Sequence, residues 1–139
     1  MALRDRTPKK GKRADIEEKF QNVLESDKVI TIILTSQDGL PIASGKPQEA
    51  FPEPMLSALT ATLMSTSDQM GSQMSLGNSR NLMVDLDGGV LLLREIRERV
   101  TLGVILEKDA NLPYYDVVLQ KLVREIDKIL FPDLHKKKV

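Results

Sequence analysis

The most prominent pattern in this chain is a long, nearly uncharged helix followed by three short strands. Residues 54–74 contain one charged side chain, Asp68, and begin with Pro54. Proline suits the first turn of a helix because its missing N–H would have no partner there. At 3.6 residues per turn the segment makes about five turns or more. One stripe of this helix carries the large apolar side chains expected to face the core, which are Leu56, Leu59, Leu63, Met70 and Met74.

The opposite side of this helix carries small residues where an exposed helix usually has Lys and Glu. These residues are Ala58, Ala61, Thr62 and Ser65. Small side chains allow a second backbone to approach closely, so we expect this face to contact another helix, in a second copy or in a partner. A helix buried within a single domain, or a Ser/Thr-rich face in water, would have the same composition.

A short helix and a hairpin precede the long helix. Apolar residues recur with helical spacing from Asp15 to Ser26. Residues Val29–Thr35 form a β-branched run that predicts a strand. Asp38-Gly39 predicts a hairpin turn, because glycine accepts positive φ, and Leu40–Gly45 is the return strand.

Three strands and an amphipathic helix follow the long helix. The strands are predicted at Asn81–Leu86, Val90–Arg94 and Arg99–Leu106. Asn111 is expected to cap the last helix, which Pro113 opens and which reaches about Phe131.

The element order is therefore α-β-β-α-β-β-β-α, an α+β fold. Hairpin-length turns favour antiparallel pairing. The runs Ile32–Leu34 and Leu91–Leu93 are apolar on both sides, which indicates a sheet covered on both faces. We expect one domain, residues 14–132, with a five-stranded antiparallel sheet between the long helix and two flanking helices.

Charge separates the termini from the rest of the chain. Residues 1–13 carry six cations against Asp5, and Lys136, Lys137 and Lys138 close the chain. Removing these nine cations and Asp5 leaves eleven basic and nineteen acidic side chains, a net charge near −8. We interpret residues 1–13 and 133–139 as disordered, solubilising tails. Contact of the N-terminal tail with an anionic membrane is a less favoured interpretation, and no aromatic residue is interleaved for stacking on nucleic-acid bases.

The amino-acid composition limits the cellular compartment and the kinds of catalysis that we expect. The chain has no cysteine and no apolar run of about 18 residues, so we expect a cytoplasmic protein. The single histidine, His135, lies in the lysine-rich terminus without catalytic neighbours. Asp85 and Asp87 bracket a turn but lack the further ligands of a calcium loop. Neither a phosphate-binding loop nor a nucleophile elbow is present.

Arginines are the remaining candidates for chemistry, since an arginine supplied in trans can stabilise phosphoryl transfer. Arg97 and Arg99 lie in a charged turn between strands that we interpret as a solvated loop, while Arg80 and Arg94 flank strands. On the residues alone, we expect a non-catalytic interaction domain with no cofactor and no metal.

Segment Ile32–Ser44 resembles the first hairpin of the Roadblock/dynein light chain family. Members of that family have an apolar strand, Asp-Gly followed by a hydrophobic residue, and a short strand ending in Ala-Ser, here Asp38-Gly39-Leu40 and Ala43-Ser44. The Ala/Ser/Leu-rich helix, the strand Asn81–Leu86, the Gly-Gly turn and the segment Leu102–Leu112 are similar to the rest of the domain. The resemblance covers about residues 14–130 and is stronger to the prokaryotic members.

The resemblance implies a Roadblock/profilin-like fold and a homodimer whose third strands pair across a two-fold axis. The pairing strand would comprise Asn81, Leu82, Met83, Val84, Asp85 and Leu86. The helix contact would comprise Ala58, Ala61, Thr62 and Ser65, the small-residue face described above. Further partner contacts are expected on one flank of the long helix, at Met55, Thr66, Gln69 and Gln73.

The family generally provides non-catalytic platforms for small GTPases, so the resemblance implies a homodimer that binds and regulates a Ras-like GTPase, by activation or by scaffolding. The alternative is a structural adaptor in a motor, trafficking or membrane-associated complex. A third and weaker hypothesis is an enzyme with a small-molecule pocket in a profilin-like sheet fold.

Overall fold

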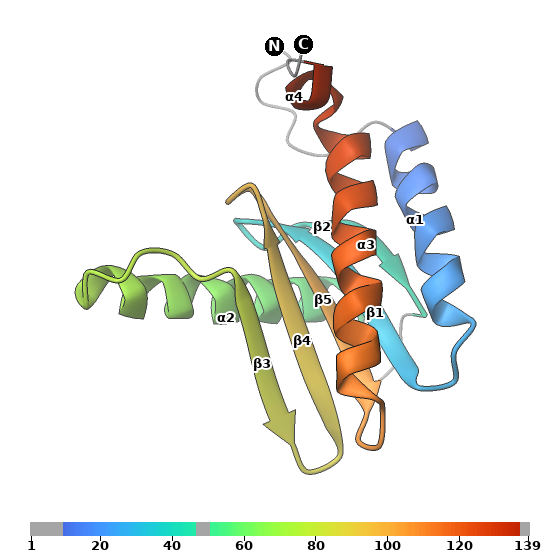
Figure 1. Ribbon diagram of the computed structural model, residues 1–139, viewed down its shortest axis with the longest axis horizontal. Coiled ribbons are helices and arrows are strands. Elements are labelled where there is room, and N and C mark those ends of the chain that lie inside the picture. Colours follow the sequence, from blue (N-terminus) through green and yellow to red (C-terminus); the bar gives the residue numbers. More distant parts are fainter. Residues whose placement is uncertain (1–9, 47–50, 137–139) are drawn as a thin grey trace.

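A computed structural model describes the backbone of residues 10–46 and 51–136. Nine elements lie in these ranges (Figure 1): α1 Lys10–Leu24, β1 Val29–Ser36, β2 Pro41–Gly45, α2 Glu53–Gln73, β3 Asn81–Leu86, β4 Gly89–Ile96, β5 Val100–Glu107, α3 Leu112–Leu130 and α4 Pro132–Lys136. Residues 1–9 and 137–139, expected in the tails, and the side chain of His135 lie outside the described part.

The five strands form one antiparallel sheet in the order β2-β1-β5-β4-β3. Helices α1 and α3 lie side by side on one face, and α2 crosses the strands on the other (Figure 1). The predicted α+β fold is therefore confirmed. Strand β3 forms one edge of the sheet and pairs with β4 alone.

The apolar core lies between the sheet and the helices α1 and α3. Phe20 and Ile16 of α1 and Leu119 of α3 are fully buried against strand residues such as Leu102. The predicted cap is present, since the Asn111 side chain accepts the Tyr114 N–H at 3.0 Å. The helical stripe Tyr115, Leu119, Leu122 and Ile126 is buried, as its spacing predicts.

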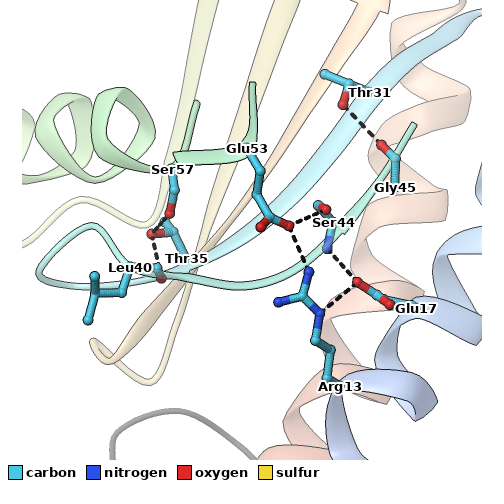
Figure 2. Close-up of polar contacts among 9 residues, drawn as sticks. All are labelled: Arg13, Glu17, Thr31, Thr35, Leu40, Ser44, Gly45, Glu53 and Ser57. Carbon is cyan, nitrogen blue, oxygen red and sulfur yellow. Dashed lines mark hydrogen bonds and ion pairs between the residues drawn. The ribbon is translucent and has the colours of Figure 1, made fainter. Parts of the chain in front are cut away.

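The opposite face of the sheet carries hydroxyl groups and a glycine beside the buried side chains of Ile33 and Leu93. Ser57 of α2 donates to Thr35 Oγ1 at 2.5 Å, and Thr35 donates to the Leu40 carbonyl at 3.2 Å (Figure 2). A methyl group built at Gly103 would lie 3.3 Å from Thr60 Cγ2 of the helix. The helix is therefore held close to the sheet by small residues.

This packing changes which side of α2 faces the core. Its buried residues are Leu56, Ser57, Thr60, Ala61 and Met64. Of the stripe predicted for the core only Leu56 is buried, Leu63 is half-buried, and Leu59, Met70 and Met74 are 54%, 61% and 62% exposed. That prediction is wrong because Thr35 and Gly103 of the sheet bring Ser57 and Thr60 of the helix inward, which turns Leu59 and Met70 outward. Ala61 is expected at a helix contact between chains, but it lies on the side of the helix that is buried within this chain.

The helical part of the chain begins earlier than the sequence predicts. Helix α1 starts at Lys10, so residues 10–13 are helical instead of belonging to a disordered tail. Arg13 bonds Glu17 at 3.0 Å and Glu53, at the start of α2, at 2.7 Å (Figure 2). The Ser44 N–H donates to Glu17 at 3.0 Å, so the cluster joins α1, β2 and α2. Helix α4 likewise includes residues 133–136, which were expected in the C-terminal tail.

Replacing Gly103 with valine should reduce stability by about 1–3 kcal/mol, because overpacking forces neighbours apart. The new side chain would meet Ile33 Cγ2, 3.1 Å from the Cβ position, and Leu93 Cδ2 at 3.2 Å. Urea unfolding followed by circular dichroism measures the change. Gly88→Ala is the control, since nothing lies within 4 Å of its Cβ position. Equal midpoints for the two variants would contradict the close packing of α2.

Candidate dimerisation and partner-binding surface

The outer edge of β3 is open to a further strand. Met83 and Leu86 are 57% and 48% exposed, and Leu82 and Val84 are half-buried. Register with β4 places Leu82 opposite Leu93 and Val84 opposite Leu91, so Leu82 and Val84 lie on the face that α2 partly covers. All six residues predicted for strand pairing therefore form one edge strand with apolar side chains on both faces.

The C-terminal half of α2 projects past this edge (Figure 1). None of residues 65–73 in the described helix is buried, and Asp68 is the only charged residue among them. Met70, Met74 and the following Leu76 are 61%, 62% and 75% exposed. Single exposed apolar residues are ordinary, but a group of them on a helix with almost no charge marks a contact surface.

The other residues predicted on α2 are exposed along the same helix. Ala58, Thr62 and Ser65 are available for a helix contact, in contrast to Ala61, and Thr62 donates to the Ala58 carbonyl at 2.8 Å. The predicted partner contacts Met55, Thr66, Gln69 and Gln73 are exposed as well. The surface thus combines an open strand edge with most of the predicted helix residues.

Sequence reasoning did not assign Leu59, Met70, Met74 and Leu76 to this surface. The sequence does contain a signal for this surface. Large apolar residues are spread around α2 too widely for all of them to face one core. Together with the missing charge, this pattern is typical of a helix that packs on two sides.

The projecting end of α2 is fastened by its own loop. The Ser79 N–H donates to Asp68 Oδ1 at 2.6 Å, and the hydroxyls of Ser67 and Ser79 are in contact. The Gly71 carbonyl accepts the Leu76 N–H at 2.6 Å and the Gly77 N–H at 3.2 Å. A Cβ at Gly71 would lie 1.9 Å from the Gly77 carbonyl oxygen, so this turn requires glycine there.

A half-buried carboxylate, Glu95, lies where α2 passes over the end of β4. Glu95 Oε1 is buried without a hydrogen-bond partner in the described part of the chain. Burial raises the pKa of Glu95, and the negative charges of Asp68 and Glu98 raise it further. The three carboxylates line a cavity of about 250 Å³ with Gln37, Ser65 and Arg99.

Three of the four arginines considered for chemistry are engaged by α3 or its end. Arg94 bonds Asp116 at 2.8 Å, and Arg97 bonds Asp127 at 2.6 Å. Arg99 lies 5.7 Å from the centre of the Phe131 ring. Arg80 is exposed in the loop before β3. These contacts give Arg94, Arg97 and Arg99 a structural role between the sheet and α3.

Two further findings concern residues 10–46 and 51–136. No helix there has the length and apolar content needed to cross a bilayer. In the same ranges, no three His, Cys, Asp or Glu side chains converge on a position for a metal ion.

The five-stranded sheet, with two helices on one face and a crossing helix on the other, defines the class of Roadblock/profilin-like domains. Residues 15–106 match the family model of the Roadblock/LC7 domain. The chain therefore belongs to the Roadblock/LC7 family, as the hairpin resemblance indicates. No curated protein matches it in sequence.

Solved structures show the same fold at low identity. Myxococcus xanthus MglB is 18% identical, with 86% of each chain covered and a TM-score of 0.74. A Roadblock/LC7 domain from Streptomyces avermitilis is 20% identical, covers 80% of this chain and 92% of its own, and has a TM-score of 0.72. The gliding protein MglB from Thermus thermophilus is 13% identical, with 88% and 93% covered and a TM-score of 0.75.

Replacing Glu95 with glutamine should stabilise the protein at neutral pH. A carboxyl with a raised pKa in the folded state favours folding when protonated, and this contribution is lost as pH rises through the folded pKa. The melting temperature of Glu95→Gln should exceed that of the parent at about pH 7 and approach it near pH 4, close to the ordinary glutamate pKa. Glu18→Gln, on the exposed side of α1, is the control. A difference in melting temperature between Glu95→Gln and the parent that does not change with pH would contradict the burial of this carboxylate.

Proposed function

We propose that this protein is a homodimeric, non-catalytic platform in the cytoplasm that binds and regulates a small Ras-like GTPase. The observation that carries the proposal is the open edge of β3 beside the projecting half of α2, which has Asp68 as its only charged residue. Family membership supports it, because Roadblock proteins generally serve small GTPases. MglB proteins are among the structural neighbours, and one neighbouring structure is described as MglB with a tetrameric arrangement, which favours self-association.

Pairing of β3 with β3 of a second copy would extend the sheet to ten strands. An exposed edge with unpaired N–H and C=O groups is a template for another strand, and pairing removes that liability. A two-fold axis normal to the sheet relates two antiparallel edge strands, so both α2 helices would lie on the same face. Each projecting half of α2 would then lie over the partner's β3 and β4, where the exposed apolar residues find cover.

Side-chain chemistry favours one register for this pairing. Directly opposed residues of antiparallel strands share a face. Placing Met83 on the two-fold axis sets Met83 against its own copy, Leu82 against Val84, and Asn81 against Asp85. Moving the axis to Val84 would set Met83 against Asp85, which is a poorer match. We therefore infer that Met83 lies on the axis.

The GTPase would bind the outer side of the paired α2 helices, where Met55, Thr66, Gln69 and Gln73 are exposed. Such a platform regulates by binding one conformation of the switch regions better than the other, which shifts their population. Both α2 helices would face the same side, so one GTPase could contact residues of both copies.

Met83→Cys should form a disulfide-linked dimer, because a residue on the axis meets its own copy at about 4.5–5.5 Å between Cα atoms. The natural chain has no cysteine, so the readout is free of background. Non-reducing gel electrophoresis after mild oxidation measures the yield. Asp87→Cys, in the exposed β3–β4 turn, is the control and should stay monomeric on the gel. Equal yields would contradict the register, and a protein with the mass of one chain at all concentrations in light scattering would contradict the homodimer.

The dimer should bind a small Ras-like GTPase of its source organism and change its rate of GTP hydrolysis. Thr66→Arg should weaken binding at least about tenfold, because it places a charge in the proposed contact. Isothermal titration and phosphate release measure the two effects. Gln21→Arg, an equally exposed change on α1 at the other face of the sheet, should bind normally. Failure of the parent protein to bind any of these GTPases would refute the proposal.

A further inference from the structure

The outward face of α3 separates its charges by sign. Each of its three carboxylates faces a cation of another element: Asp116 with Arg94 at 2.8 Å, Asp127 with Arg97 at 2.6 Å, and Glu125 with Lys19 at 4.0 Å. Its three cations Lys121, Arg124 and Lys128 are exposed and make no ion pair or side-chain hydrogen bond in the described part of the chain. The fold therefore uses the negative charges of α3 internally and leaves its positive charges to solvent.

These cations continue an apolar stripe along the helix. At 100° per residue, an arc of about 80° on the side opposite the core contains Tyr114, Val117, Lys121, Arg124 and Lys128. Tyr114 and Val117 are 57% and 64% exposed. The strip is about 21 Å long at 1.5 Å per residue, apolar at the start of α3 and cationic toward its end.

A groove runs beside this strip, between α3 and α1. It has a volume of about 590 Å³ and is lined by Val23 and Val118 as well as Tyr114 and Val117. Lys121 and Arg124 line it further along α3. The contact between the Ser26 and Tyr115 hydroxyls places the end of α1 at the start of α3. Glu25 therefore lies at the apolar end of the groove, away from Lys121 and Arg124. It is the one carboxylate of the lining that makes no ion pair in the described ranges.

We propose that this groove binds an acidic amphipathic helical segment of a partner protein. Apolar side chains at one end of the segment would cover Tyr114 and Val117, and carboxylates further along would pair with Lys121, Arg124 and Lys128. Charge complementarity fixes the orientation, with the acidic end of the segment toward the end of α3. The groove lies on the sheet face opposite α2, so the proposal is independent of the GTPase-binding surface.

A single acidic helix fits this surface better than a broad anionic surface such as a membrane. The strip is one helix wide, and the neighbouring α1 exposes Asp15 and Glu18. A lipid bilayer pressed against both helices would meet Asp15 and Glu18, whereas a single helix in the groove would avoid them because neither residue lines it. Binding to anionic vesicles is therefore a competing outcome that the experiment must separate.

The test uses the full chain, labelled with ¹⁵N, and a synthetic helix of about 18 residues. The peptide carries leucines on one face of its first half and glutamates on the same face of its second half. Amide shifts should concentrate on α3 and the facing side of α1, and leave α2 and β3 unchanged. A scrambled peptide of the same composition is the control. No binding, or shifts centred on α2, would overturn the proposal.

Charge reversal provides the decisive comparison. K121E/R124E should weaken binding of the acidic peptide by about tenfold or more, and a peptide with lysines in place of the glutamates should bind this variant but not the parent. Gln21→Arg, outside the groove lining, should change nothing. K121E/R124E should keep the same oligomeric state in solution as the parent. Weaker peptide binding by this variant then cannot be attributed to a failure of the proposed dimer. Binding to phosphatidylglycerol vesicles that displaces the peptide and is lost in K121E/R124E would assign the strip to lipid instead.

Discussion

The close seating of α2 on the sheet is the constraint on which the rest of the structure depends. The helix is held by the Ser57–Thr35 hydroxyl contact and by the space that Gly103 leaves for Thr60. Because Thr35 and Gly103 lie under the helix, it presents Ser57, Thr60 and Ala61 to the sheet together with Leu56 and Met64. Leu59, Met70 and Met74 then lie toward solvent. One packing choice on the inner side of the helix thus creates the contact surface on its outer side.

The order of elements, the sheet and most boundaries could be predicted from the sequence. The β-branched run at Val29, the Asp38-Gly39 turn and the Asn111 cap are local signals, and local signals determine local structure. The stripe of α3 was equally readable, because one apolar side of that helix faces one apolar face of the sheet. Belonging to the Roadblock/LC7 family could be inferred from the hairpin because its turn and flanking strands are spaced as in that family.

The inner side of α2 could not be predicted, because it depends on what the helix packs against. Ser57 and Thr60 look like solvent-facing residues until Thr35 and Gly103 are placed beneath them. Ala61 illustrates the same difficulty, since a small residue suits a tight contact with a sheet of its own chain as well as with a second helix. The start of α1 was missed for a related reason: Arg13 looks like part of a basic tail until Glu17 and Glu53 meet it.

The strand order carries a consequence for how the chain folds. Strand β1 lies between β2, its neighbour in sequence, and β5, which follows more than sixty residues later. During synthesis the first hairpin therefore has one edge of β1 unpaired. That edge stays unpaired until β5 has been synthesised. Such non-local closure slows folding, since loop entropy must be overcome before the contacts form. Strand β5 and α3, which follow the other four strands in the sequence, complete the core.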